Sequence, residues 1–387
     1  MRNRAAVCFG EGQGWQIVET ELDPPAPGEV MVRLHVAGMC HTDDHKATGP
    51  MNNHDPEHGI VLYPFIGGHE GAGVVEAVGE GVTSVVPGDH VVMCWINACG
   101  RCRMCASGQQ FLCDSGLMSQ QPDIAASQAR NHLDGEPIYS FGQGTFAERL
   151  VADEGFVIKI EPDIPFDVAA LVGCGVTTGF GSAVERAEVV AGDVVVVVGI
   201  GGLGAAAVQA AHLSGARFVV AVDPVEFKRE KAFELGATHT SHSMEEALSL
   251  VNDISWGMLA DKVIVTVGVL AGEHVQAALA LTRKGGTCVV SSVAPMGHHD
   301  VDMDLFTFVL SQKTLKGSLY GGCSPRAEIP RILHLHRSGR IDVPAMITRR
   351  YSLSEVNLGY QHMMEGRNIR GVIDIVGEPT ADAGEHA

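Results

Sequence analysis

The sequence has little positive charge and no long apolar segment. It contains 27 Lys and Arg residues against 46 Asp and Glu residues, a formal net charge of −19. Such an acidic surface repels phosphate backbones, which argues against nucleic acid as a partner. Asp193 and several glycines interrupt the most apolar stretch, so we expect no membrane insertion. The start of the chain, Met1–Ala5, runs into strand-like sequence without the apolar stretch of a signal peptide.

The composition is that of a globular protein with several domains. The chain has 387 residues, of which 45% are apolar and 19% charged, and this length is enough for two or three domains with a sizeable core. The sequence shows no internal repeat. Ten cysteines are present, and their spacing favours metal binding over disulfides. We therefore expect a reducing compartment, with the cytoplasm as the default.

Two sequence styles follow each other along the chain. Up to about residue 150, short strand-like runs are separated by Gly and Pro turns, which predicts a β-barrel-like domain. Further on, strands and helices alternate, which predicts a doubly wound parallel sheet. The last part of the chain again resembles the first part, the β-barrel-like region. The expected fold class is α/β, with a barrel-like domain of residues 1–178 and 321–387 and an inserted nucleotide-binding domain of residues 179–320.

Two insertions and the tail depart from these styles. Residues 52–59 and 117–139 are polar and loop-like, and loops of this length are more often functional lids than spacers, with disorder as the alternative. The acidic tail, residues 377–387, is expected to be disordered.

A dinucleotide-binding pattern lies in the predicted parallel sheet. Five valines, Val194–Val198, form a strand-like run that leads directly into Gly199, Gly201 and Gly204 with the spacing G-x-G-x-x-G, and a helix-forming stretch follows. The first glycine permits a tight turn, the second lets the backbone approach a pyrophosphate, and the third lets helix and strand pack closely. A second apolar strand ends at Asp223, where a carboxylate can accept hydrogen bonds from the ribose. The complete series favours a nucleotide site over an ordinary strand-turn-helix.

Four cysteines lie within fifteen residues. Cys99, Cys102, Cys105 and Cys113 have spacings that suit a closed tetrahedral zinc site of four thiolates. A disulfide pair conflicts with a reducing compartment, and iron–sulfur clusters use other cysteine spacings. We predict a structural zinc site here, with no open position for a substrate.

Three further candidates are dispersed along the chain: Cys40, His69 and Cys174. Taken singly, each cysteine is more often a small buried apolar residue, and the histidine more often a core residue. Glycines beside His69 and Cys174 suggest tight turns where backbone or ligand comes close. Spacing alone does not join the three.

Several of these motifs together resemble the zinc-dependent medium-chain alcohol dehydrogenases. The motifs are Gly67–Val74, the four-cysteine loop, Gly173–Gly179 and the nucleotide pattern with Asp223, and the resemblance extends over residues 5–376. Within the superfamily, residues 170–175 and 222–231 resemble actinobacterial nicotinoprotein, or N,N-dimethyl-4-nitrosoaniline-dependent, alcohol dehydrogenases. The implied fold is a GroES-like catalytic domain with an inserted Rossmann domain.

The resemblance also implies a catalytic site. It makes Cys40, His69 and Cys174 the ligands of a catalytic zinc that keeps a fourth position open for water or alcohol. Asp43 is implied to orient the imidazole ligand, and Glu70 to lie behind the metal. Proton transfer is implied to use the Thr42 hydroxyl and then a solvent-facing imidazole, with the cofactor ribose between them. That last imidazole is His45.

The implied cofactor is NAD(H). Asp223 repels a 2′-phosphate and so favours NAD over NADP, with nearby Lys228 and Arg229 as the counter-indication. By resemblance, His41 and Arg370 lie near the pyrophosphate, and Lys228 contacts a ribose. The predicted cofactor-binding residues are His41, Thr178, Gly199, Gly201, Gly202, Leu203, Gly204, Asp223, Lys228 and Arg370.

The expected activity is reversible oxidation of a primary or secondary alcohol to an aldehyde or ketone. NAD(H) is either exchangeable or held tightly and recycled by an external acceptor. One alternative is a thiol-dependent (mycothiol- or glutathione-type) formaldehyde dehydrogenase, for which Arg130 and His132 are weak candidates to bind the thiol's carboxylates. Another is a zinc-stabilised nucleotide-binding protein without catalysis. The expected partners are a small alcohol or aldehyde and further copies of the chain, in a dimer or tetramer.

Overall fold

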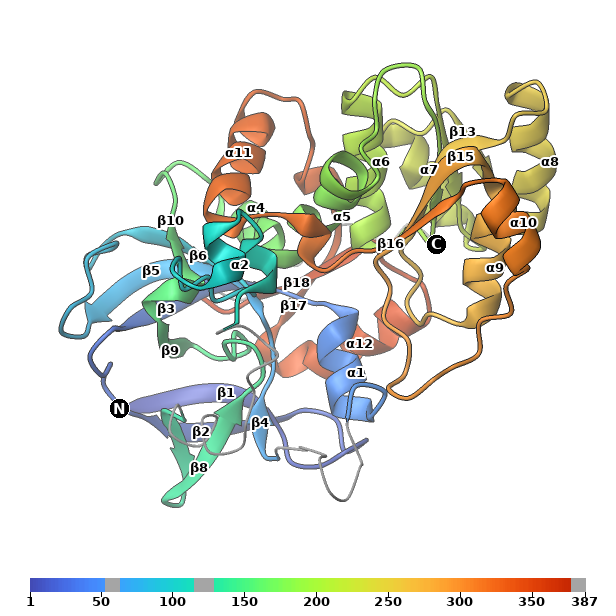
Figure 1. The fold of residues 1–387 in the computed structure, drawn as a ribbon. Coiled ribbons are helices and arrows are strands. Elements are labelled where there is room, and N and C mark those ends of the chain that lie inside the picture. Colours follow the sequence, from blue (N-terminus) through green and yellow to red (C-terminus); the bar gives the residue numbers. More distant parts are fainter. Residues whose placement is uncertain (53–62, 115–128, 377–387) are drawn as a thin grey trace. The chain divides into compact units, whose positions relative to one another are not determined.

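The computed structural model describes residues 1–52, 63–114 and 129–376. The chain divides into two compact units (Figure 1). The first comprises residues 1–174, 325–333 and 347–387, and the second comprises residues 175–324 and 334–346. The insertion at 52–59, most of the stretch 117–139 and the tail lie largely outside the described residues.

The first unit is built from β-structure. Short alternating strands form a closed barrel, and longer strands form a sheet in which β3 and β5 pair antiparallel from Val30–Val78 to Gly38–Glu70. The barrel strands in order are β1 (Arg2–Cys8), β2 (Gln16–Leu22), β7 (Asn131–Leu133), β8 (Glu136–Ser140) and β4 (Phe65–Ile66). The sheet strands in order are β10 (Val157–Lys159), β6 (His90–Met93), β5 (Glu70–Val78), β3 (Glu29–Gly38), β18 (Arg370–Asp374) and β17 (Ile347–Ser352), with β9 (Arg149–Asp153) paired to β3.

An aromatic core supports this unit. Trp15 packs edge-on against Phe65 and Phe146, with ring centroids 5.6 Å apart in both pairs. Its ring stacks on Tyr360 of α12 (Val356–Met364) at 6.1 Å. Large rings bury much apolar area in fixed geometry, so this cluster is a rigid base for the segments around it. The unit's other described helices are α1 (His41–Thr48), α2 (Arg103–Ala106), α4 (Phe166–Leu171) and the first part of α11 (Pro325–Arg337).

The second unit contains a six-stranded parallel sheet. Its strand order, relative to the first strand in sequence, is 3-2-1-4-5-6, the order of the Rossmann fold. Val194, Val196 and Val198 pack with α8 and α9 in one buried cluster on a single face of the sheet. The strands are β13 (His239–Ser241), β12 (Phe218–Val222), β11 (Val194–Val198), β14 (Ala260–Val265), β15 (Thr282–Val290) and β16 (Thr314–Gly317). The helices include α5 (Thr177–Gly181), α6 (Gly202–Leu213), α7 (Glu226–Glu234), α8 (Met244–Ile254), α9 (Gly272–Leu281) and α10 (Leu305–Leu310).

The predicted fold class is confirmed, and one prediction within it is wrong. Part of the expected loop at 117–139 forms the hairpin of β7 and β8, which adds two strands to the barrel. This segment reads as a loop because its strands are short and separated only by the turn at Asp134 and Gly135. The structure also adds the short edge strands β13 and β16 to the predicted sheet.

In contrast to the expectation from sequence, one helical run is long and apolar enough by composition to cross a membrane. It covers Phe166–Arg186, and 89% of its most apolar window is buried inside the protein. The core helix of a soluble protein has the same properties, so this run is weak evidence for a membrane span.

Candidate functional site

Three residues far apart in sequence meet in the first unit. Cys40 directly precedes α1, His69 lies between β4 and β5, and Cys174 follows α4. Their side chains are buried, and the ligand atoms of Cys40, His69 and Glu70 lie within 4.8 Å of one another. The Cys174 thiol hydrogen-bonds to Cys40, and this bond is the main cause that lowers the pKa of Cys40 well below its ordinary value. The structure thus brings together the three residues that the resemblance implied as zinc ligands.

Local backbone features place these side chains. Gly68 has φ of +90°, and a Cβ at that residue would collide with Thr145 and Phe146, so the turn before His69 requires glycine. Cys174 lies in a π-helical turn, Val172–Val176. Such turns insert one extra residue into a helix and are frequent at functional sites.

Asp43 holds the His69 imidazole. Its Oδ1 accepts a hydrogen bond from the Gly68 amide at 2.8 Å and lies 3.1 Å from His69 Nδ1. The buried Nε2 of His69 has no hydrogen-bond partner among the described residues. An imidazole that donates from Nδ1 presents Nε2 as an acceptor, here beside two thiols. One nitrogen and two sulfurs are the donor set of a catalytic zinc with three protein ligands, so the residues present fit the metal.

The predicted proton relay lies on α1. Thr42 Oγ1 is 3.5 Å from the sulfur of Cys40. His45 is only 5% exposed, so the expectation of a solvent-facing imidazole is wrong in this respect. Its Nε2 is buried without a hydrogen-bond partner in the described part of the chain. Burial lowers the pKa of His45, which keeps the ring neutral and able to accept a proton. The ring of His41, also on α1, lies 6.0 Å from that of His45.

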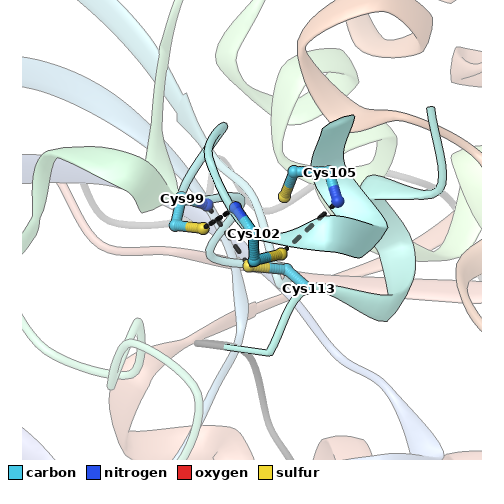
Figure 2. A group of neighbouring side chains, drawn as sticks. All are labelled: Cys99, Cys102, Cys105 and Cys113. Atoms are coloured by element: carbon cyan, nitrogen blue, oxygen red, sulfur yellow. Dashed lines mark hydrogen bonds between the residues drawn. The ribbon is translucent and has the colours of Figure 1, made fainter. Parts of the chain in front are cut away.

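The four-cysteine loop is compact. The four sulfurs lie within 4.8 Å of one another, and those of Cys102 and Cys113 are 4.0 Å apart (Figure 2). Sulfurs bound tetrahedrally to one zinc lie about 3.8 Å apart, given Zn–S bonds of about 2.3 Å. The amides of Cys102 and Cys105 donate to the sulfurs of Cys99 and Cys102, each at 3.4 Å. Backbone amides of Arg101 and Cys102 lower the pKa of Cys99 to about 6, which favours the thiolate. The loop therefore fits a closed zinc site.

The glycine turn of the second unit has the geometry that a dinucleotide needs. Gly199 has φ of +89°. A Cβ on Gly204 would collide with the carbonyl of Gly199, so this glycine allows α6 to pack closely on the turn. A Cβ on Gly201 would meet no protein atom within 4 Å, which leaves open space at the start of α6. This is the place where a pyrophosphate binds at a helix N-terminus, so the turn fits the cofactor.

Asp223 lies at the end of β12 and is buried. Its two carboxylate oxygens accept hydrogen bonds from the amides of Ile200, at 2.7 Å, and Val225, at 2.9 Å. A carboxylate has about four acceptor positions, so Asp223 can still accept from a ribose. The Arg229 guanidinium donates to the carbonyls of Asp223 and Pro224. Arg229, one of the two cationic residues that argued against a preference for NAD, therefore has a structural role.

The remaining predicted cofactor residues of this unit lie on α5, α6 and α7. Gly202 and Leu203 begin α6, and a Cβ on Gly179 would collide with the Leu203 carbonyl, so α5 lies against the start of α6. Thr178 on α5 is buried, and its carbonyl accepts from Ser182. Lys228 is half-buried on α7. Their contacts with a cofactor stay predictions.

Comparison with known proteins identifies the family. Residues 26–162 match the alcohol dehydrogenase GroES-like domain, and residues 202–337 match the zinc-binding dehydrogenase domain. Alcohol dehydrogenase B of Mycobacterium tuberculosis is 42% identical over 376 residues, covering 96% of this chain and 98% of that one. The chain belongs to the zinc-dependent alcohol dehydrogenases.

Two further comparisons support the same family. The NDMA-dependent alcohol dehydrogenase of Amycolatopsis methanolica is 43% identical over 374 residues, covering 96% of this chain and 99% of that one. The crystal structure of an alcohol dehydrogenase zinc-binding domain protein from Burkholderia ambifaria matches with a TM-score of 0.88 at 29% identity, covering 97% of this chain and 100% of that one. The chain is thus an oxidoreductase of a family that uses zinc and NAD(H).

A buried ion pair lies beside the predicted catalytic residues of this dehydrogenase. The guanidinium of Arg370 at the start of β18 contacts the carboxylate of Glu70, and both side chains are almost completely buried. A Cβ on Gly38 would collide with this carboxylate, so the glycine makes room for the pair. Arg370 Nε has no hydrogen-bond partner among the described residues. Its predicted contact with pyrophosphate stays a prediction.

Sequence reasoning missed three aromatic residues at the site. The rings of Trp95 and Phe141 lie 5.8 Å and 6.3 Å from the His69 ring, and the Tyr360 hydroxyl donates to the Cys40 carbonyl at 3.3 Å. Trp95 Nε1 is buried without a hydrogen-bond partner in the described ranges. Tyr360 reads from sequence as a core residue of an amphipathic helix. Only Phe141 could have been suspected from sequence, because it precedes Gly142 and Gly144 in a stretch that predicts a tight turn.

Proposed function

We propose that this dehydrogenase oxidises a primary or secondary alcohol to an aldehyde or ketone, reversibly, with NAD as the hydride acceptor. The observation that carries the proposal is the buried group of Cys40, His69 and Cys174, in which His69 Nε2 has no protein partner among the described residues. A protein that only binds nucleotide does not need such an open donor set. This argues against the non-catalytic alternative.

The chain's own residues supply orientation and proton transfer. A zinc ion held by Cys40, His69 and Cys174 would supply Lewis-acid chemistry that lowers the pKa of a bound alcohol. Asp43 keeps the His69 ring in position through its hydrogen bond to Nδ1. The Thr42 hydroxyl accepts the alcohol proton and passes it toward neutral His45. The side chains of Cys40, His69 and Cys174 are buried, which limits the access of water to this group.

NAD is the preferred nucleotide in this proposal. Asp223 places negative charge where NADP carries its 2′-phosphate. The Arg229 guanidinium is already bonded to two backbone carbonyls. We further propose that NAD(H) is held tightly and reoxidised by an external acceptor, a proposal supported by the 43% identity to a relative named as NDMA-dependent.

One experiment tests both parts of this proposal. The protein is gel-filtered and denatured, and released NAD(H) is assayed; alcohol oxidation is then measured with an artificial acceptor and no added NAD. We expect nearly one NAD(H) per subunit and turnover without soluble NAD. Turnover that requires soluble NAD leaves an ordinary alcohol dehydrogenase, whereas no alcohol oxidation under either condition contradicts the whole proposal.

The thiol-dependent alternative is weaker. It needs free cationic groups for the carboxylates of a thiol adduct. Arg130 forms two hydrogen bonds with Glu29, each at 2.8 Å, and His132 lies 2.8 Å from Asp23. Both candidates are therefore engaged within the barrel unit.

We also propose a homo-oligomer in the cytoplasm. Four apolar side chains of α10 are 64–75% exposed: Leu305, Phe306, Val309 and Leu310. In the chain, α10 directly precedes β16, an edge strand of the parallel sheet. A second copy related by a twofold axis can cover such a patch with the same patch of its own. The four-cysteine loop has the arrangement of a metal site, and such cysteine clusters are typical of reducing compartments. Sedimentation of a Phe306→Asp variant tests the surface: a lower association state supports it and an unchanged one contradicts it.

A further inference from the structure

Tyr360 makes a contact that the catalytic scheme does not use. It lies on α12 in the same unit as Cys40 and is 5% exposed. Its hydroxyl donates a hydrogen bond to the backbone carbonyl of Cys40, at 3.3 Å. The hydroxyl is thus bonded to the backbone of a predicted zinc ligand, a contact that packing of the ring alone does not require.

The Cys40 carbonyl accepts hydrogen bonds from residues of two helices, α12 and α1. Cys40 is the N-cap of α1, with an extended backbone (φ −126°, ψ 147°) and no capping bond from its side chain. Its carbonyl also accepts the amide of Asp43, at 3.3 Å, which starts the first turn of α1. A carbonyl oxygen has two lone pairs, and these two donors use them. The Cys40 peptide group is thus held from two sides, while its side chain makes no capping bond to the helix.

The first turn of α1 carries the residue that holds the His69 imidazole in place. Asp43 lies in this turn and contacts both the amide of Gly68 and Nδ1 of His69. Thr42 in the same turn lies 3.5 Å from the Cys40 sulfur. Rotation of the Cys40 peptide would therefore move one zinc ligand directly and alter the support of another.

We propose that Tyr360 is a positioning residue whose hydroxyl fixes the Cys40 peptide and so sets the direction of its thiolate relative to His69. This inference rests on the proposed zinc-dependent function. Mutation of a residue that orients a metal ligand typically lowers metal affinity or activity by about 10- to 100-fold.

The ring of Tyr360 is held independently of its hydroxyl. It stacks on Trp15 at 6.1 Å with an interplanar angle of 26° and lies 6.3 Å from Phe146. Tyr360→Phe therefore keeps the aromatic packing and removes one hydrogen bond. Tyr351→Phe is a matched control, because Tyr351 is buried in the same unit and its hydroxyl bonds to His362 at 2.9 Å, which is not a predicted ligand.

The test measures metal binding as well as activity. Each variant is prepared with cobalt in the catalytic site and zinc in the four-cysteine site; the cobalt–thiolate absorption, the rate of cobalt release to a chelator, the melting temperature and turnover are recorded. For Tyr360→Phe we expect a shifted absorption band, roughly tenfold faster cobalt release and roughly tenfold lower kcat with KM changed less. The zinc of the four-cysteine site and the fold, followed by circular dichroism, are expected to stay unchanged. Tyr351→Phe is expected to match the wild type in absorption and cobalt release.

The possible outcomes separate this inference from the proposed function. A wild-type absorption band and release rate in Tyr360→Phe contradict the positioning role, even if the enzyme oxidises alcohols as proposed. Equal changes in both variants, or loss of the four-cysteine zinc in Tyr360→Phe, point to general destabilisation and also contradict it. A wild-type protein that binds no metal outside the four-cysteine loop overturns the proposed function itself, and this inference with it.

Discussion

The two predicted zinc sites of the first unit use similar chemistry but are built in different ways. The four-cysteine site takes all its ligands from Cys99–Cys113, and its short loop brings the sulfurs together with the help of backbone amides. The predicted catalytic site takes its ligands from three segments, near α1, β5 and α4, and 134 residues separate Cys40 from Cys174. One site depends on a loop, and the other on the whole unit.

This difference matches the two roles. Four thiolates complete a tetrahedral shell and leave no position for a substrate. Two thiols and one imidazole leave a position open, and supporting groups hold the ligands in place: Asp43 on His69 and Tyr360 on Cys40. A dispersed site can be surrounded by relay and substrate-contacting residues, whereas a short loop exposed at the surface cannot. The comparison predicts that the first site matters for stability and the second for turnover.

The largest expected effect is that of removing the imidazole ligand. We expect His69→Ala to lose one of two zinc ions per subunit and to reduce turnover by roughly 10³-fold or more, because Lewis-acid assistance is worth several kcal/mol of barrier. Metal analysis and alcohol oxidation rates measure this. His132→Ala, a histidine outside both sites, is the control and should keep both ions. A His69→Ala enzyme with two zinc ions and normal turnover contradicts the assignment of the catalytic site.

The complementary change is at the four-cysteine loop. We expect Cys102→Ser to lose the other zinc and about 3 kcal/mol of stability, on the order of 10 °C in melting temperature, because this metal contributes folding energy. Activity per catalytic zinc should be retained. Cys288→Ala is the control, since burial raises the pKa of this core thiol to about 12 and it belongs to neither site. Unchanged zinc content and melting temperature in Cys102→Ser would falsify the structural role.

The contrast also explains how much could be predicted from sequence. The four-cysteine loop and the glycine turn at Gly199–Gly204 are local, so spacing alone indicates their chemistry. The dispersed site was predictable only through resemblance, because contacts such as Cys40–Cys174 depend on how sheet and helices pack. Tyr360 and Trp95 were missed for the same reason: an aromatic residue in a helix or beside a strand looks like core until its neighbours are known. The burial of His45 was missed because exposure is a property of the folded unit.

A smaller effect is expected at the first relay group. Thr42→Val keeps the shape of the side chain and removes the hydroxyl that accepts the alcohol proton. We expect turnover to fall by roughly 10²-fold, the usual scale of general acid–base assistance, with zinc content unchanged. Thr42→Ser restores a hydroxyl and is expected to recover most of the activity. Wild-type rates in Thr42→Val would exclude the proposed proton path.

The smallest expected effect concerns His45, the last member of the relay. Burial lowers its pKa below the ordinary value of about 6.5, while Asp44 and Cys40 partly oppose this. The ring is therefore neutral and accepts protons at neutral pH, and it becomes protonated only as the pH falls through the lowered pKa. The wild-type rate should then decrease on the acidic side of this lowered pKa, whereas His45→Gln, which cannot titrate, should lose this decrease and run only a few-fold slower at neutral pH because water can replace the ring. Rate–pH profiles of both enzymes, with stability checked at each pH, measure this. Identical profiles would show that His45 takes no part in proton transfer, so that the relay ends at Thr42.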